Sequence, residues 1–199
     1  MTDSTYSMLA DVDVVLLRPR WARNLGSVAR AMKNFGLRKM TIVDSQIGSW
    51  NDAYQMAVQA DDILDNAKAT DLTTALSKSS WIVGTSNEPP PGSRVLTPRE
   101  VADMALERGA PTLLFGGEIN GLDPAELLRC QVVSTVPTAK EQTSLNLSHS
   151  VSIYGAELYA ACERARKDTS ATSRGERVQT PLATTEMLQR VEISLTRLL

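Results

Sequence analysis

The sequence predicts an α/β domain in which helices flank a mainly parallel sheet. Short apolar runs rich in β-branched residues, typical of buried strands, alternate along the chain with segments of helical periodicity. This alternation is the pattern of a parallel sheet whose crossover connections are helices. The 199 residues, 42% of them hydrophobic, are enough for one domain of ordinary size with a small appendage.

Five segments are expected to form the strands, because each is short, apolar and bounded by polar or turn-forming residues. They are residues 12–17, 40–43, 81–84, 112–115 and 132–136. The first run is stopped at Pro19, which has no backbone donor for a ladder hydrogen bond. Residues 87–92, with three prolines, are expected to form a loop after the third strand.

The first helix is expected to begin after Asn24. Asn24 is a residue type that caps helix N-termini, and the apolar residues after it recur at helical spacing. Gly36 is typical of a helix C-terminus. The same criteria predict further helices at residues 53–67, 72–79, 98–108 and 124–130.

Residues 146–167 are expected to form the longest helix. Its apolar stripe consists of Leu147, Val151, Tyr154, Leu158 and Cys162. The stripe is widened, beyond what one sheet face needs, by Ile153, Ala156 and Ala160. The extra width indicates a second buried side, for instance in a dimer interface.

Two units are therefore expected: a domain over residues 1–167 and a C-terminal extension over residues 168–199. The extension begins with a polar, Ser/Thr-rich linker over residues 168–179 and ends in an amphipathic helix over residues 184–199. Of a shorter natural form and a truncated extension, the apolar end of that helix favours the truncated one.

The composition argues against several classes of protein. No run approaches the roughly 18 apolar residues of a membrane span, and the N-terminus lacks the basic and apolar regions of a signal peptide. Cys130 and Cys162 are isolated in apolar surroundings, which indicates reduced thiols in a cytoplasmic protein. With His149 as the only histidine, neither a metal site nor a Ser-His-Asp triad is expected.

Basic residues are concentrated in one segment, although the formal net charge of the chain is −2. Residues 14–43 contain no Asp or Glu, and their basic residues are Arg18, Arg20, Arg23, Arg30, Lys33, Arg38 and Lys39. This cationic segment on an acidic chain indicates contact with a polyanion such as RNA. A solvated basic face is the alternative.

Three segments with unusual content leave predicted strands, at residues 84–87, 115–122 and 136–146. They are expected to meet at the carboxyl edge of the sheet, where ligands bind in such folds. No dinucleotide or P-loop glycine motif is present, so the residues by themselves predict only a small-ligand pocket. Each residue taken singly also has a structural explanation: turn glycines, an exposed carboxylate at Glu118, or a helix cap at Ser144 or Asn146.

Together the segments resemble the SpoU (TrmH-type) family of SPOUT RNA 2′-O-ribose methyltransferases. The first motif reads NLGSVARAMKNFG at residues 24–36, and the second reads LFGGEINGL at residues 114–122. The third is VP at residues 136–137 followed by SLNLS at residues 144–148. Gly84-Thr85-Ser86 and the PLAT sequence at residues 181–184 are most similar to the TrmJ branch, which methylates tRNA.

The resemblance implies S-adenosylmethionine as methyl donor, bound within a C-terminal trefoil knot, and an obligate homodimer. The backbone expected to hold the cofactor surrounds Thr85, Ser86, Asn87, Gly116, Gly117, Val136, Thr143, Ser144 and Leu145. The catalytic residues implied are Arg30, which acts from the other protomer, Asn24, which orients it, and Glu118, Ser144 and Asn146. RNA is expected to contact Arg18, Arg20, Arg23, Arg30 and Lys33.

The implied reaction is attack of a ribose 2′-oxygen on a sulfonium methyl group. The family proposal makes Arg30 the base, which conflicts with a guanidinium that stays charged. The alternative is that Arg30 stabilises the developing alkoxide while the proton leaves through Ser144 or water. tRNA is favoured as substrate, with rRNA methylation and a non-catalytic RNA-binding homologue as alternatives. Unlike TrmJ-like chains, this one keeps only Arg94 shortly after the Gly-Thr-Ser sequence.

Overall fold

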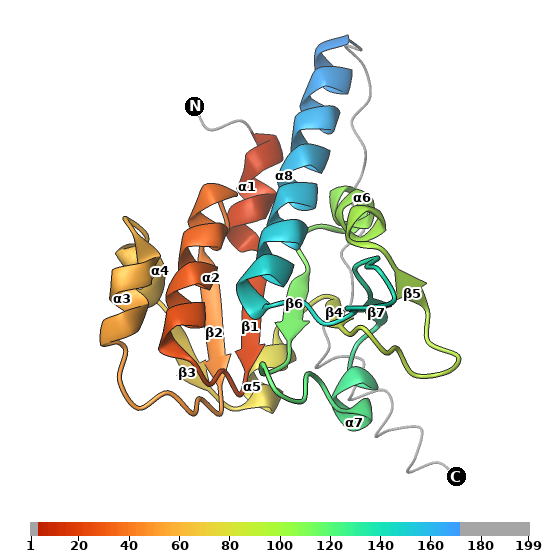
Figure 1. Ribbon diagram of the computed structural model, residues 1–199. Helices are drawn as coiled ribbons and strands as arrows, with labels where there is room; N and C mark the ends of the chain where they lie inside the picture. The colour runs from red at the N-terminus through yellow and green to blue at the C-terminus, as the bar shows by residue number, and fades with distance from the viewer. Residues whose placement is uncertain (1–3, 172–199) are drawn as a thin grey trace.

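A parallel sheet in the order β3-β2-β1-β6-β4-β7-β5 forms the centre of the computed structural model, which describes residues 4–171 (Figure 1). Its strands are β1 Asp13–Leu17, β2 Lys39–Val43, β3 Lys68–Thr70, β4 Ile82–Thr85, β5 Val95–Leu96, β6 Thr112–Phe115 and β7 Val132–Ser134. Every pairing between these neighbours is parallel, as predicted.

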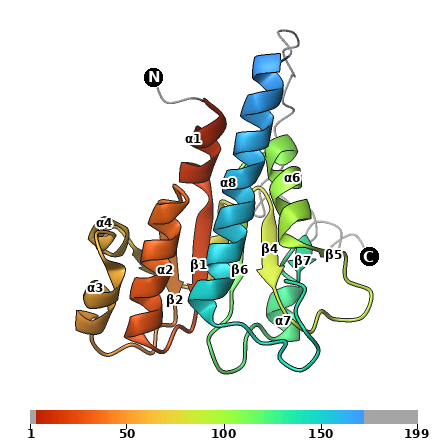
Figure 2. The same ribbon diagram turned by 45° about the horizontal axis from the view of Figure 1, so that its top comes forward.

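Helices cover both faces of the sheet. They are α1 Ser4–Asp11, α2 Ala22–Asn34, α3 Asn51–Ala57, α4 Asp61–Asp65, α5 Leu72–Ser77, α6 Pro98–Arg108, α7 Pro124–Leu127 and α8 Leu147–Ala171. Figures 1 and 2 show α8 running along one face between α2 and α6. The opposite face is covered by α5 and α7, whose Leu76 and Leu127 join a smaller apolar cluster.

The central strands are apolar along their whole length because both faces are buried. In β1, Val14 and Leu16 belong to the large cluster under α2 and α8, whereas Val15 and Leu17 belong to the smaller cluster. Successive strand residues point to opposite faces, so burial on both sides needs a continuous apolar run. The five predicted strands are confirmed as β1, β2, β4, β6 and β7.

The structure differs from the predicted elements in several places. The helix expected over residues 53–67 is two helices, because Val58 and Gln59 take positive φ angles of 40° and 66° and end α3. Helix α1 and the short strands β3 and β5 were not predicted. Helix α8 continues to Ala171, past the boundary expected at residue 167.

The rest of the expected linker and the final helix lie outside the described residues. The trefoil knot stays a prediction. Among the described residues, no helix has the length and apolarity needed to cross a membrane.

Candidate active site

A cavity of about 830 Å³ lies at the carboxyl ends of β4, β6 and β7. All three of the unusual segments contribute to its walls. The expected cofactor residues that line it are Thr85, Ser86, Asn87, Gly116, Gly117, Val136, Thr143, Ser144 and Leu145. The parallel strands bring these segments together because their carboxyl ends share one edge.

Hydrogen bonds tie the first and third segments to each other. The Asn87 side chain donates to the Thr143 hydroxyl at 3.1 Å, across 56 residues of sequence. The Thr135 hydroxyl donates to the carbonyl of Ser86 at 2.7 Å, and the Ser86 amide donates to the carbonyl of Ser134. These bonds fix two walls of the cavity relative to one another.

Tyr154 of α8 closes the cavity on its buried side. Its ring packs edge-on against Phe115, with 5.6 Å between centroids, and its hydroxyl donates to Ser134 Oγ at 2.7 Å. Burial raises the pKa of Tyr154 to about 12, so the phenol stays neutral at physiological pH. Tyr154 therefore contributes shape and a dipole to the cavity and no charge.

The second segment is a tight glycine loop. The Gly121 amide donates to the carbonyl of Gly117 at 3.0 Å. A Cβ atom at Gly116 would lie only 2.0 Å from the carbonyl carbon of Gly121, so the loop closes on itself only without a side chain there. The closure leaves Glu118 near the tip of the loop.

The Glu118 carboxylate accepts hydrogen bonds from residues 20–24 of the cationic segment. Oε2 accepts from the Arg20 amide at 2.9 Å, and Oε1 accepts from the Asn24 side chain at 3.0 Å. The Trp21 amide approaches the same Oε1 at 3.5 Å. The carboxylate thereby holds residues 20–24 in place and sets a negative charge beside the N-terminus of α2, where the helix dipole favours it.

Asn24 does not cap α2 as expected. The helix begins at Ala22, so its N-cap is Trp21, three residues earlier, and no side chain makes a cap bond. The Asn24 amide nitrogen donates to Glu118, and its oxygen accepts from the side chain of Asn146 at 3.0 Å. Its side-chain bonds therefore join the first motif to the second and third, and neither runs to Arg30.

Asn146 has both a capping and a linking role. Its side-chain oxygen accepts from the Ser148 amide at 2.9 Å and from the Ser148 hydroxyl at 2.7 Å, which caps α8. Its amide nitrogen donates to Asn24. The cap explanation and the site explanation for Asn146 therefore hold together.

The cations of the segment fall into two groups. Lys33 pairs with Asp62 at 2.7 Å, Lys39 pairs with Asp11 at 2.7 Å, and Arg18 pairs with Glu126. The hydrogen bond from Arg18 to Glu126 raises the pKa of that guanidinium. No ion pair with residues 4–171 is formed by Arg20, Arg23, Arg30 or Arg38.

Arg30 lies on the exposed side of α2 and is not among the residues that line the cavity. Ser144, by contrast, lines the cavity with an exposed side chain. Within one chain the structure therefore brings together Glu118, Asn24, Asn146 and the cavity wall, and it leaves Arg30 outside.

A sequence model of the SpoU rRNA Methylase family matches residues 11–156, which include all three motifs and the whole cavity wall. The chain belongs to this family.

Within the SpoU family the chain is similar in sequence to TrmJ proteins. The TrmJ of Methanocaldococcus jannaschii, a tRNA (cytidine-2′-O-)-methyltransferase, is 36% identical over 159 residues, 76% of this chain and 69% of that protein. The Pseudomonas aeruginosa TrmJ, a tRNA (cytidine/uridine/adenosine-2′-O-)-methyltransferase, is 36% identical over 197 residues, 94% of this chain and 75% of that protein.

The crystal structure of TrmJ from Z. mobilis superposes with a TM-score of 0.79 at 26% identity, covering 94% of this chain and 79% of that one. These similarities confirm the family and the branch that the three motifs predict.

Two residues beside this site were not predicted from the sequence. Trp21 is 50% exposed between Arg20 and Arg23, and this aromatic residue among arginines was a readable signal. Glu126 is 8% exposed and pairs with an arginine 108 residues away, for which the local sequence gives no signal.

Proposed function

We propose that this chain transfers the methyl group of S-adenosylmethionine to a ribose 2′-oxygen of tRNA. The observation that carries the proposal is the Glu118–Asn24–Asn146 network, which joins the cationic segment to the cavity. Membership of the SpoU family and the similarity to TrmJ proteins support both the reaction and the class of RNA.

The cavity suits the cofactor in size and in lining. Its volume lies in the range of about 300–1,000 Å³ typical of sites for small molecules and cofactors. The glycine loop offers backbone groups without side chains over them, and Leu122 and Leu145 offer apolar surface. When bound, S-adenosylmethionine supplies an electrophilic methyl group and a good leaving group.

The RNA is proposed to lie against the unpaired cations of the segment. Arg20, Arg23 and Arg30 are exposed and make no ion pair within residues 4–171, so they are available to phosphates. The exposed ring of Trp21 between them offers a stacking face for a base of a single-stranded loop. Lys33 also remains available, because an exposed ion pair such as Lys33–Asp62 is weak.

In the proposed reaction Arg30 stabilises the negative charge that develops on the 2′-oxygen, and it stays protonated throughout. The hydroxyl proton passes to the Ser144 side chain, which releases its own proton to water. Glu118 and Asn24 act by position, since they hold the second motif against the start of α2. Alignment of the 2′-oxygen with the methyl group supplies much of the acceleration.

The place of Arg30 outside the cavity of its own chain supports a site shared between two copies. A mixture of Arg30→Ala and Ser144→Ala proteins tests this arrangement. If the partner supplies Arg30, each heterodimer contains one intact site, and the mixture regains about a quarter of wild-type activity on random pairing. A mixture that stays inactive would show that Arg30 serves its own chain.

The function is tested with methyl-labelled S-adenosylmethionine and unmodified tRNA and rRNA transcripts, followed by mapping of the labelled nucleotide. Label on a tRNA ribose is the expected result. Label on rRNA alone would support the rRNA alternative. RNA binding without cofactor binding or label would support the non-catalytic homologue.

A further inference from the structure

Arg18 occupies an unusual position at the point where β1 meets the glycine loop. Its φ angle is 56°, and its amide donates to the carbonyl of Val43 at 2.8 Å. A Cβ atom at Gly117 would lie 2.5 Å from the carbonyl oxygen of Arg18. The backbone of Arg18 is therefore packed directly against the start of the loop, where only glycine fits.

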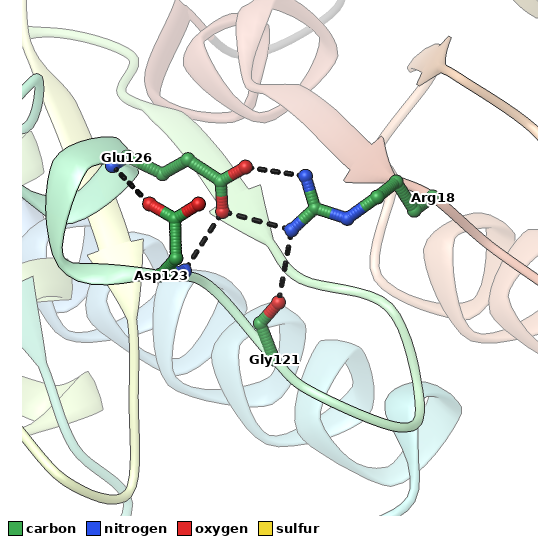
Figure 3. Close-up of polar contacts among 4 residues, drawn as sticks. All are labelled: Arg18, Gly121, Asp123 and Glu126. Carbon is green, nitrogen blue, oxygen red and sulfur yellow. Dashed lines mark hydrogen bonds and ion pairs between the residues drawn. The ribbon is translucent and has the colours of Figure 1, made fainter.

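The side chain of Arg18 reaches the far end of the same loop (Figure 3). Its guanidinium donates to both carboxylate oxygens of Glu126, through Nη1 to Oε1 and through Nη2 to Oε2 at 2.9 Å. Nη2 also approaches the carbonyl of Gly121 at 3.4 Å. Bidentate arginine–carboxylate pairs are among the strongest and most directional polar contacts in proteins.

Glu126 is itself fixed on the α7 side. Its Oε2 accepts from the Asp123 amide at 2.8 Å, and the Glu126 amide donates to the Asp123 carboxylate at 2.8 Å. These reciprocal bonds form the capping box of α7. The carboxylate that receives Arg18 is therefore held in place by the first turn of α7.

Residues 18–21 thus donate hydrogen bonds to residues 118–126 at two places, one near each end of the loop. Glu118 of the loop accepts from the Arg20 amide, while Arg18 donates to Gly121 and Glu126. Between these contacts lies the loop wall of the cavity, Gly116–Leu122. The Arg18 contact gives the end of this wall a side-chain hydrogen bond in addition to the packing of Leu122 in the smaller apolar cluster.

We propose that Arg18 is a positioning residue that holds the glycine loop in the shape that receives S-adenosylmethionine, and that it is not a phosphate contact. This inference rests on the proposed function for the identity of the ligand. It replaces the expectation that Arg18 binds RNA, because its donors already serve Glu126 and Gly121.

The test compares Arg18→Lys and Glu126→Gln with wild type. Both variants keep the approximate size of the side chain and remove the bidentate pair, and circular dichroism with thermal unfolding reports their folding. We expect the Kd and the KM for S-adenosylmethionine to rise about tenfold in each, because the loop wall shifts. The double variant is expected to be no weaker than either single one, because both act through the same contact.

RNA binding separates positioning from phosphate contact. The dependence of tRNA affinity on salt is expected to stay at the wild-type slope in Arg18→Lys. In Glu126→Gln the guanidinium of Arg18 is freed, so tRNA affinity is expected to stay unchanged or to rise. This variant provides the measurement of tRNA binding if Arg18→Lys does not fold. Asp62→Asn is the matched control, because it breaks the exposed Lys33–Asp62 pair far from the loop and leaves cofactor affinity unchanged.

The opposite pattern overturns the inference. Wild-type cofactor affinity in both variants, with weaker tRNA binding and a salt slope reduced by about one in Arg18→Ala, would make Arg18 a phosphate contact. If the wild-type chain binds no S-adenosylmethionine, the proposed function fails. Amide hydrogen exchange of residues 116–123 then tests whether Arg18 holds the loop. Faster exchange in Arg18→Lys supports the positioning role, and unchanged exchange contradicts it.

Discussion

Similar polar side chains have different roles at the amino ends and at the carboxyl ends of the strands. Near the amino ends of the strands, Asp13 accepts from the Thr41 hydroxyl at 2.9 Å, and the Ser79 and Thr112 hydroxyls share a hydrogen bond of 2.6 Å. In both pairs one side chain supplies the hydrogen-bond partner of the other. At the carboxyl ends, Glu118, Asn24 and Asn146 meet across about half the chain, and Glu118 also lines the cavity of about 830 Å³.

The difference shows that residue type does not separate structure from function in this fold. Strand direction does so, because the loops that leave the carboxyl ends are free to diverge and leave room for a ligand. Polar groups at the amino edge bond to each other, whereas the side chains of Asn24, Glu118 and Asn146 at the carboxyl edge join three separate motifs. Substitutions at the two edges should therefore affect different observables.

The largest effect is expected at the carboxyl edge from Arg30→Ala. The exposed side chain supports no packing, so the melting temperature should stay unchanged. Loss of the charge that stabilises the 2′-oxygen is expected to lower kcat at least ~100-fold. Methyl transfer to tRNA measures it, with Arg108→Ala on α6 as control. Near-normal activity would remove Arg30 from the site.

Glu118→Gln is expected to have the next largest effect. Glutamine keeps one acceptor, and its new N–H₂ group faces the donors of Arg20 and Asn24. We expect kcat/KM for methyl transfer to fall about 10–100-fold, with a small loss of stability. The matched control is Glu107→Gln, an exposed glutamate on α6. Equal losses in both variants would contradict a special role for Glu118.

Trp21→Ala separates RNA binding from catalysis within the carboxyl edge. Loss of one stacked base is expected to weaken tRNA binding about tenfold, while cofactor affinity stays unchanged. Trp21→Tyr should restore most of the binding. Tyr54→Ala, which removes an exposed aromatic ring from α3, provides the control. If Trp21→Ala instead separates two copies of the chain, the ring is a subunit contact.

The smallest effect is expected at the amino edge from Asp13→Asn. Burial raises the pKa of Asp13, although the Thr41 hydrogen bond and the charges of Lys68 and Lys39 partly offset it. The folded chain therefore holds this proton more tightly than the unfolded chain, and wild-type stability falls as the pH rises from 3.8 through the raised pKa.

Asparagine carries no charge, so Asp13→Asn is expected to raise the melting temperature by about 1–3 °C at pH 7. The gain should shrink as the pH is lowered towards 3.8, and methyl transfer should stay unchanged. Thermal unfolding between pH 4 and 7 measures it. A lower melting temperature at pH 7 would show that attraction to the two lysines outweighs burial.

The sequence by itself determined the fold class, the central strands, helix α6 and the family. Strands buried on both faces must be apolar throughout, so β1 and β6 are visible as runs, and the three motifs are contiguous stretches of residues. The edge strands β3 and β5 were not predicted because they are short and largely exposed. The break at Val58 escaped because its positive φ angle belongs to a residue that rarely adopts one.

Only the tertiary structure decided what individual polar residues do. Local pattern predicted Asn24 as a helix cap, yet Asn24 binds Glu118 and Asn146, and local pattern gave no sign of the pair between Arg18 and Glu126. Propensity and periodicity act over a few residues, whereas these hydrogen bonds span 94, 122 and 108 residues. A polar side chain takes the partner that the folded chain brings within about 3 Å, and only the packed sheet sets that distance.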